Sequence, residues 1–241
     1  MNKSPVYVAV DTPEISHARK LAQVLGPWVG GLKLGLEFFC AHGPAGVREV
    51  MGGTELPLFL DLKLHDIPNT VAGAVRSVVP LRPTFLTVHA GGGAAMLRAA
   101  VEAATDEAAK LGVPVPGILA VTVLTSLDGD DLHEIGQHGP IREQVARLAG
   151  LAKRSGVAGV VCAPGEVTTL REQNGPGFVL MVPGIRPVWA AAQDQKRILT
   201  PALAMQAGAS HLVIGRPITG ATDPAEAARL VGAELRPLGF K

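Results

Sequence analysis

The chain is poor in cysteine, in excess charge of either sign and in long apolar runs. It has two cysteines, Cys40 and Cys162, which lack metal-ligand spacing, so we expect two buried free thiols in a reducing, cytoplasmic setting. Lys and Arg number 22 against 21 for Asp and Glu. This balance gives no overall field that would attract nucleic acid or a membrane surface. Any anion site must therefore be local.

No apolar run reaches membrane-spanning length, and no low-complexity segment or linker divides the chain. The first residues run directly into a strand-like segment, so we expect no signal peptide. Hydrophobic residues make up 47% and charged residues 18%, a composition that excludes disorder. We therefore expect residues 1–241 to form one soluble catalytic domain, because 241 residues can bury a full core.

What the chain does contain is a repeated unit: a short apolar run, a loop and a longer helical pattern. The runs are continuous rather than alternating, which is typical of parallel strands buried on both faces. They span Val6–Val10, Val29–Leu34, Leu58–Leu62, Thr84–Val88, Gly117–Val123, Val157–Val161, Phe178–Val182 and Leu212–Ile214. Eight such units predict a single (β/α)8 TIM barrel. A doubly wound open sheet is the main alternative, weakened because no Gly-x-Gly-x-x-Gly turn follows the first run.

Several helix ends can be read from the sequence. The pairs Thr12-Pro13 and Thr200-Pro201 each predict a capping threonine followed by proline at the first helical position. Gly26 is expected to end the first of these helices. Asp223, followed three residues later by Glu226, resembles a capping box at the start of the last helix.

Polar residues follow most of the apolar runs at the point where the predicted strand ends. In a barrel these ends share one face, and that face carries the chemistry. The residues concerned are Asp11, Lys33, Asp61, Lys63, Asp66, His89, Thr125, Arg186 and Arg216.

Asp61 and Lys63 are two residues apart on one strand, so both side chains should point into the barrel mouth, while Leu62 and Leu64 face the helices. A structural ion-pair network is the alternative, but buried charge is costly and a purely structural position would usually be apolar. Lys63, lying between carboxylates, should stay protonated. That state suits a general acid and suits a Schiff-base lysine poorly.

A phosphate site is predicted after the last two strands, where barrel enzymes often bind this group. Gly215-Arg216 offers backbone N–H groups and a guanidinium, and Arg186 and Gln195 lie in the preceding long loop. Surface arginines on a polar rim are the alternative. Thr125 either binds a substrate heteroatom or caps its own turn. His89 is interpreted as a hydrogen-bonded barrel histidine.

The run Asp61-Leu62-Lys63-Leu64-His65-Asp66-Ile67-Pro68-Asn69-Thr70 resembles the signature of the orotidine 5′-phosphate decarboxylase family. The resemblance extends over nearly the whole chain. The other matching segments are Val8–Asp11, Lys33–Glu37, Thr87–Ala90, Leu124–Ser126, Pro183–Pro187, Asp194–Arg197 and Ile214–Ile218.

This resemblance implies an enzyme without cofactor or metal that converts orotidine 5′-phosphate to UMP and carbon dioxide, the last step of de novo pyrimidine synthesis. It also implies a homodimer in which Asp66, Ile67 and Thr70 reach the partner's site. Lys63 would be the proton donor, assisted by Asp61, Asp66 and Lys33.

The substrate contacts are likewise implied by the resemblance. Asp11 and Lys33 would bind the ribose, Asp61 would lie by the departing carboxylate, and Thr125 would bind the pyrimidine edge. The remaining contacts would come from Pro183 and from a phosphate grip of Arg186, Gln195, Gly215 and Arg216.

Three rival functions stay open at this point. A sister sugar-phosphate decarboxylase shares the shorter Asp-x-Lys-x-x-Asp pattern and depends on a divalent metal, but the Ile67–Thr70 continuation favours the nucleotide enzyme. A catalytically silent phosphate-binding barrel would keep Arg186 and Arg216 without needing Lys63. A Schiff-base aldolase would use Lys63 as a neutral amine, which the flanking carboxylates disfavour.

Overall fold

The computed structural model describes residues 3–190 and 199–240. Eight parallel strands follow one another around a closed barrel in chain order, and β8 pairs with β1. The strands are β1 Val6–Ala9, β2 Gly31–Gly35, β3 Leu58–Leu64, β4 Phe85–His89, β5 Gly117–Val121, β6 Gly159–Val161, β7 Val179–Val182 and β8 His211–Ile214. The predicted (β/α)8 barrel is therefore confirmed.

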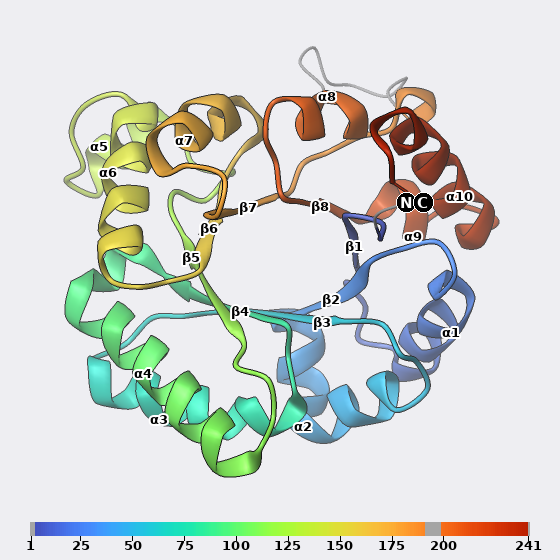
Figure 1. The fold of residues 1–241 in the computed structure, drawn as a ribbon, viewed down its shortest axis with the longest axis horizontal. Helices are drawn as coiled ribbons and strands as arrows, with labels where there is room; N and C mark the ends of the chain where they lie inside the picture. Colours follow the sequence, from blue (N-terminus) through green and yellow to red (C-terminus); the bar gives the residue numbers. More distant parts are fainter. Residues whose placement is uncertain (1–2, 191–198, 241) are drawn as a thin grey trace.

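Helices surround the ring of strands, as Figure 1 shows. They are α1 Ile15–Leu25, α2 Leu36–Met51, α3 Pro68–Val78, α4 Gly93–Leu111, α5 Gly129–Glu134, α6 Ile141–Arg154, α7 Val167–Asn174, α8 Pro201–Gln206, α9 Arg216–Thr219 and α10 Pro224–Leu235. Within the described ranges, none of these helices combines the length and the apolar character needed to cross a bilayer.

Two of the three predicted helix starts are confirmed, and the third is wrong. Thr200 caps α8 by accepting the N–H of Leu203, and Asp223 caps α10 through two backbone N–H groups. The helix α1, however, begins at Ile15 rather than beside Thr12, because the Thr12 hydroxyl accepts the N–H of Glu14 in a tight turn before the helix.

Two other details differ from the expectations. The strand β5 ends at Val121, two residues early, and the hydroxyl of the next residue, Thr122, donates to the carbonyl of Val161. Cys40 lies exposed on α2, whereas Cys162 is buried as expected. Both thiols are free.

Strand parity divides the core into two parts. Leu58, Leu60 and Leu62 of β3 belong to the large cluster between strands and helices, whereas Phe59 belongs to a smaller cluster inside the barrel. Tyr7, Phe59, Phe85 and His211 meet in edge-to-face or tilted contacts, with ring centroids between 5.3 and 6.3 Å apart. We call these four residues the floor, because they come from the N-terminal halves of their strands and close the barrel below its mouth.

Candidate active site

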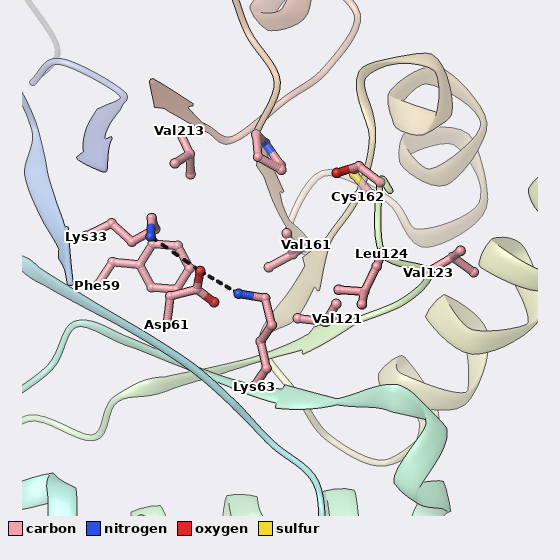
Figure 2. Close-up of a pocket in the computed structure, with 12 residues that line it drawn as sticks. Lys33, Phe59, Asp61, Lys63, Val121, Val123, Leu124, Val161, Cys162 and Val213 are labelled. Atoms are coloured by element: carbon pink, nitrogen blue, oxygen red, sulfur yellow. Dashed lines mark hydrogen bonds and ion pairs between the residues drawn. The ribbon is translucent and has the colours of Figure 1, made fainter. Parts of the chain in front are cut away.

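Four charged side chains meet above the floor, at the C-terminal ends of β1, β2 and β3. Lys33 Nζ lies 3.0 Å from Asp11 Oδ1 and 3.6 Å from Asp61 Oδ2. Lys63 Nζ lies 2.8 Å from the same Asp61 oxygen. Figure 2 shows the Asp61 carboxylate between the two amino groups. We call Asp11, Lys33, Asp61 and Lys63 the charged array.

The array has a buried centre and a more open edge. Lys33 and Asp61 are only 8% and 9% exposed, whereas Asp11 is open to solvent. Burial by itself would raise the pKa of Asp61, but the charges of Lys33 and Lys63 and hydrogen bonds from Lys63 and Thr87 outweigh it, so the pKa is lowered. Asp61 is therefore an anion at neutral pH, held by two cations.

A cavity of about 180 Å³ lies directly against the array. Three of the charged residues line it on one side, and largely apolar side chains line the other. The lining consists of Lys33, Phe59, Asp61, Lys63, Val121, Val123, Leu124, Thr125, Val161, Cys162, Pro183 and Val213. Apolar walls limit dielectric screening, so the charges act on a bound molecule more strongly than they would in water.

The cavity therefore brings Thr125 and Pro183 together with Lys33, Asp61 and Lys63, as the sequence predicted. Thr125 lies in the exposed loop beyond β5 rather than at the strand end. Its hydroxyl is thus available at the rim of the cavity, and its role in binding stays a prediction. Cys162, also on the lining, has its pKa raised by burial and by Glu166, so it remains a neutral thiol.

The sequence reading missed Thr87, which is fully buried on β4. Its hydroxyl donates to Asp61 Oδ1 at 2.9 Å and accepts the backbone N–H of Lys63, also at 2.9 Å. The missed signal was strand parity: Thr87 is two residues before His89, so both point inward from the same strand.

His89 is hydrogen-bonded, as interpreted from the sequence. Its Nδ1 accepts the N–H of Gly91 at 3.4 Å, and its ring stacks on His65 with centroids 5.1 Å apart. Burial, followed by the charges of His65 and Lys63, lowers the pKa of His89. The ring is therefore neutral near pH 7, and it does not line the cavity.

Three residues of the signature run do not join the array within this chain. Asp66, Ile67 and Thr70 are exposed where β3 leads into α3, and Ile67 is 67% exposed. The Asp66 carboxylate accepts the N–H of Ile67 at 2.6 Å. None of the three lines the cavity of its own chain, and their expected role in a partner's site is not tested by a single chain.

Three of the predicted phosphate ligands, Arg186, Gly215 and Arg216, follow β7 and β8 at the same end of the barrel and do not line the cavity. Arg186 follows β7 and is half-buried. Its backbone N–H donates to the backbone carbonyl of Leu199. Gly215 caps the short helix α9, whose first residue, Arg216, is exposed. Gln195 lies outside the described residues. The cavity and these residues together define a charged, apolar-walled pocket beside a cationic rim.

No group of three or more His, Cys, Asp or Glu side chains is arranged to hold a metal ion within residues 3–190 and 199–240. The chemistry that the described residues themselves offer is electrostatic and acid–base. The Lys63 amino group faces a largely apolar cavity, and a carboxylate lies beside it.

Comparisons with known proteins place the chain in a family. The family described as orotidine 5′-phosphate decarboxylase / HUMPS matches residues 4–231. A protein of Paramagnetospirillum magneticum named orotidine 5′-phosphate decarboxylase is 59% identical, covering 96% of this chain and 98% of its own. A protein of the same name from Rhodospirillum rubrum is 56% identical, covering 98% of this chain and 95% of its own.

Among solved structures, the orotidine 5′-phosphate decarboxylase of Lactobacillus acidophilus superposes with a TM-score of 0.85 at 38% identity, covering 96% of this chain and 99% of its own. Sequence and structure therefore agree along nearly the whole length of the protein. The chain belongs to the orotidine 5′-phosphate decarboxylase / HUMPS family.

Proposed function

We propose that this protein decarboxylates orotidine 5′-phosphate to UMP and carbon dioxide, the last step of de novo pyrimidine synthesis. The observation that carries the proposal is the 2.8 Å pair of Lys63 and Asp61 beside an apolar cavity, with Lys33 behind it. The names of relatives at 59% and 56% identity support the same substrate. In this proposal residues 1–241 work as one catalytic domain in the cytoplasm.

Lys63 is the proton donor in the proposed mechanism. The bond between C6 of the pyrimidine and its carboxylate breaks, the electron pair stays on C6, and carbon dioxide leaves. The Lys63 ammonium stabilises the developing negative charge and transfers one proton to C6, and the resulting amine regains a proton from solvent. The apolar walls support this role because they keep water away from the carbanion.

Asp61 is proposed to lie near the departing carboxylate. Two anions close together raise the energy of the bound substrate, and that repulsion is relieved when carbon dioxide leaves. Asp61 also holds Lys63 in place through the 2.8 Å contact. The lowered pKa of Asp61 supports both roles, because it keeps the carboxylate charged at neutral pH.

The remaining contacts follow the order of residues around the barrel mouth. Asp11 and Lys33 are proposed to bind the ribose hydroxyls, and Thr125 the pyrimidine edge near Pro183. The phosphate would be gripped by the cations and amides after β7 and β8, namely Arg186, Gln195, Gly215 and Arg216. Binding energy from the phosphate, which is remote from C6, can then lower the activation free energy of decarboxylation.

We further propose a homodimer in which Asp66, Ile67 and Thr70 complete the partner's site. Their exposure in the single chain supports this, because all three side chains are accessible to a partner and Ile67 is 67% exposed. Lys63→Ala and Asp66→Ala variants, each inactive alone, test it by mixing after reversible dissociation. Random exchange should restore about a quarter of wild-type activity, because roughly half of the dimers are mixed and each has one complete site. No recovery would exclude a shared site.

The proposed activity is tested by adding orotidine 5′-phosphate and following the pyrimidine absorbance in the presence of a chelator. A change in absorbance together with release of carbon dioxide is the expected result. Parallel incubation with the phosphate ester of a β-keto sugar acid, with and without added divalent metal, tests the sister decarboxylase activity. Turnover of the sugar phosphate alone would overturn the proposal.

A further inference from the structure

The strand β3 departs from regular pairing at the point where it carries the charged array. Leu60 pairs with Leu86 of β4, but the next pair joins Leu64 with Val88. Three residues of β3, numbers 61–63, therefore stand against the single residue Thr87. Such a bulge leaves backbone groups without their ladder partners and re-aims the side chains that it carries.

Lys63 carries the strain of this bulge. Its φ is 50°, a left-handed conformation that is uncommon for residues other than glycine. A buried N–H that loses its ladder partner needs another acceptor. For Lys63 that acceptor is the Thr87 hydroxyl, 2.9 Å away. One side chain of β4 thus takes the place of a backbone carbonyl.

The same hydroxyl also orients the Asp61 carboxylate. A backbone N–H can only donate, so Thr87 accepts from Lys63 and its own hydrogen is left to donate to Asp61 Oδ1 at 2.9 Å. The other oxygen, Oδ2, then faces Lys63 Nζ at 2.8 Å and Lys33 Nζ at 3.6 Å. These contacts favour the ionised carboxylate, because Oδ1 accepts from Thr87 while Oδ2 faces the amino groups of Lys63 and Lys33.

We propose that Thr87 is a positioning residue for decarboxylation, which holds the strained Lys63 backbone and the Asp61 carboxylate in one fixed geometry. This inference rests on the proposed function. Thr87 does not line the cavity, so it acts through the two residues that do. Small displacements of an ammonium relative to the reacting carbon are costly, because proton transfer and charge stabilisation both depend on distance.

The charges around Asp61 make the role measurable by pH. Lys33 from β2, Lys63 from β3 and Thr87 from β4 all face this carboxylate. Asp11, which follows β1, pairs with Lys33, and His89 at the end of β4 has a lowered pKa. The hydrogen bond from Thr87 contributes to the lowered pKa of Asp61. Removing it should move the pKa of Asp61 upward. A merely structural threonine would not produce that shift.

The test compares Thr87→Val, which keeps the shape and removes the hydroxyl, with Thr87→Ser, which keeps the hydroxyl. Thr122→Val is the matched control, because Thr122 is also buried and its hydroxyl donates only to the Val161 carbonyl. We expect T87V to lower kcat roughly 10- to 100-fold with KM within about threefold. The acid limb of the kcat/KM profile of T87V should move to higher pH. T87S should recover most of the lost kcat. The kcat of T122V should stay within about threefold of the wild-type value.

A kcat for folded T87V within about threefold of wild type, or an equal loss in T122V, would overturn the proposal. If T87V does not fold, Thr87→Ala, which also lacks the hydroxyl, replaces it in the same kinetic comparison. The Asp61 carboxyl signal, titrated by carbon NMR without substrate, should shift to higher pH in T87V and return in T87S. This measurement is independent of turnover, so it tests Thr87 even if orotidine 5′-phosphate proves not to be the substrate. An unchanged titration would also overturn the proposal.

Discussion

The floor of the barrel and its charged array meet on β3, yet burial has opposite consequences in the two regions. On β3, Phe59 belongs to the floor, and Asp61, two residues later, belongs to the array. In the floor, burial removes apolar rings from water, and it raises the pKa of Tyr7 to about 12, so that residue stays neutral. In the array, burial would raise the pKa of Asp61, but the neighbouring lysines and Thr87 lower it, so this buried carboxylate stays charged.

This difference shows where the molecule gains stability and where it loses some. Aromatic edge-to-face contacts in the floor add to the stabilisation from apolar burial. The array instead carries desolvated charges and a left-handed lysine, both of which cost free energy unless they are well paired. The floor therefore supports the barrel, and the array, at the C-terminal ends of β1, β2 and β3, is suited to chemistry.

Lys63→Ala should show the largest difference between the two regions, because it changes the array and leaves the floor intact. We expect kcat to fall about 10,000-fold, since both the proton donor and the charge stabilisation are lost. Nucleotide affinity should change far less, and the thermal midpoint should stay near that of wild type. Steady-state kinetics and calorimetric binding of UMP measure the two effects. Lys20→Ala, on the exposed side of α1, is the control; near-normal turnover of K63A would remove Lys63 as proton donor.

The converse change is Phe85→Ala in the floor. Truncating this buried ring should lower the free energy of unfolding by about 3–5 kcal/mol. The kcat of the remaining folded enzyme should change only a few-fold, because Phe85 does not line the cavity. Denaturant unfolding measures the first quantity. Leu203→Ala, on a half-exposed residue of α8, is the control and should stay within about 0.5 kcal/mol. A large loss of kcat in folded F85A would mean that the two regions are coupled.

Arg216→Ala tests the rim of the mouth rather than its centre. Loss of a charged phosphate contact should lower kcat/KM for orotidine 5′-phosphate about 100-fold. The slow reaction of the nucleoside orotidine, which lacks the phosphate, should be unaffected. Arg154→Ala, on the exposed end of α6, serves as the control. An equal loss with both substrates would mean that Arg216 does not contact the phosphate.

The smallest expected effect is on acid stability. Asp61 has a lowered pKa in the folded protein, so its contribution is present above the unfolded pKa and is lost as pH falls through the folded value. The difference in unfolding free energy between wild type and Asp61→Asn should therefore shrink as pH falls below the usual range of aspartate. Glu55→Gln, an exposed carboxylate, should give no such trend. A constant difference across pH would mean that Asp61 is not held ionised by its neighbours.

Much of the architecture follows from local pattern. Continuous apolar runs predicted all eight strands, and alternation along β3 correctly separated the helix-facing Leu62 from the inward Asp61 and Lys63. Errors appeared where a side chain had a choice of partner. Thr12 bonds within its own turn instead of capping α1, and Thr122 bonds across to β6 where β5 ends. Neither choice can be read from the residue type alone.

The sequence by itself determined the barrel, the identity of the charged residues and the end of the barrel where they gather, because strand periodicity and chain order control these features. Only the tertiary structure decided that three residues of β3 face one of β4, that Lys63 adopts a left-handed backbone and that the hydroxyl of Thr87 holds both Asp61 and Lys63. The physical reason is that a buried N–H and a buried carboxylate must find partners in space, and here the partner lies 24 and 26 residues away along the chain.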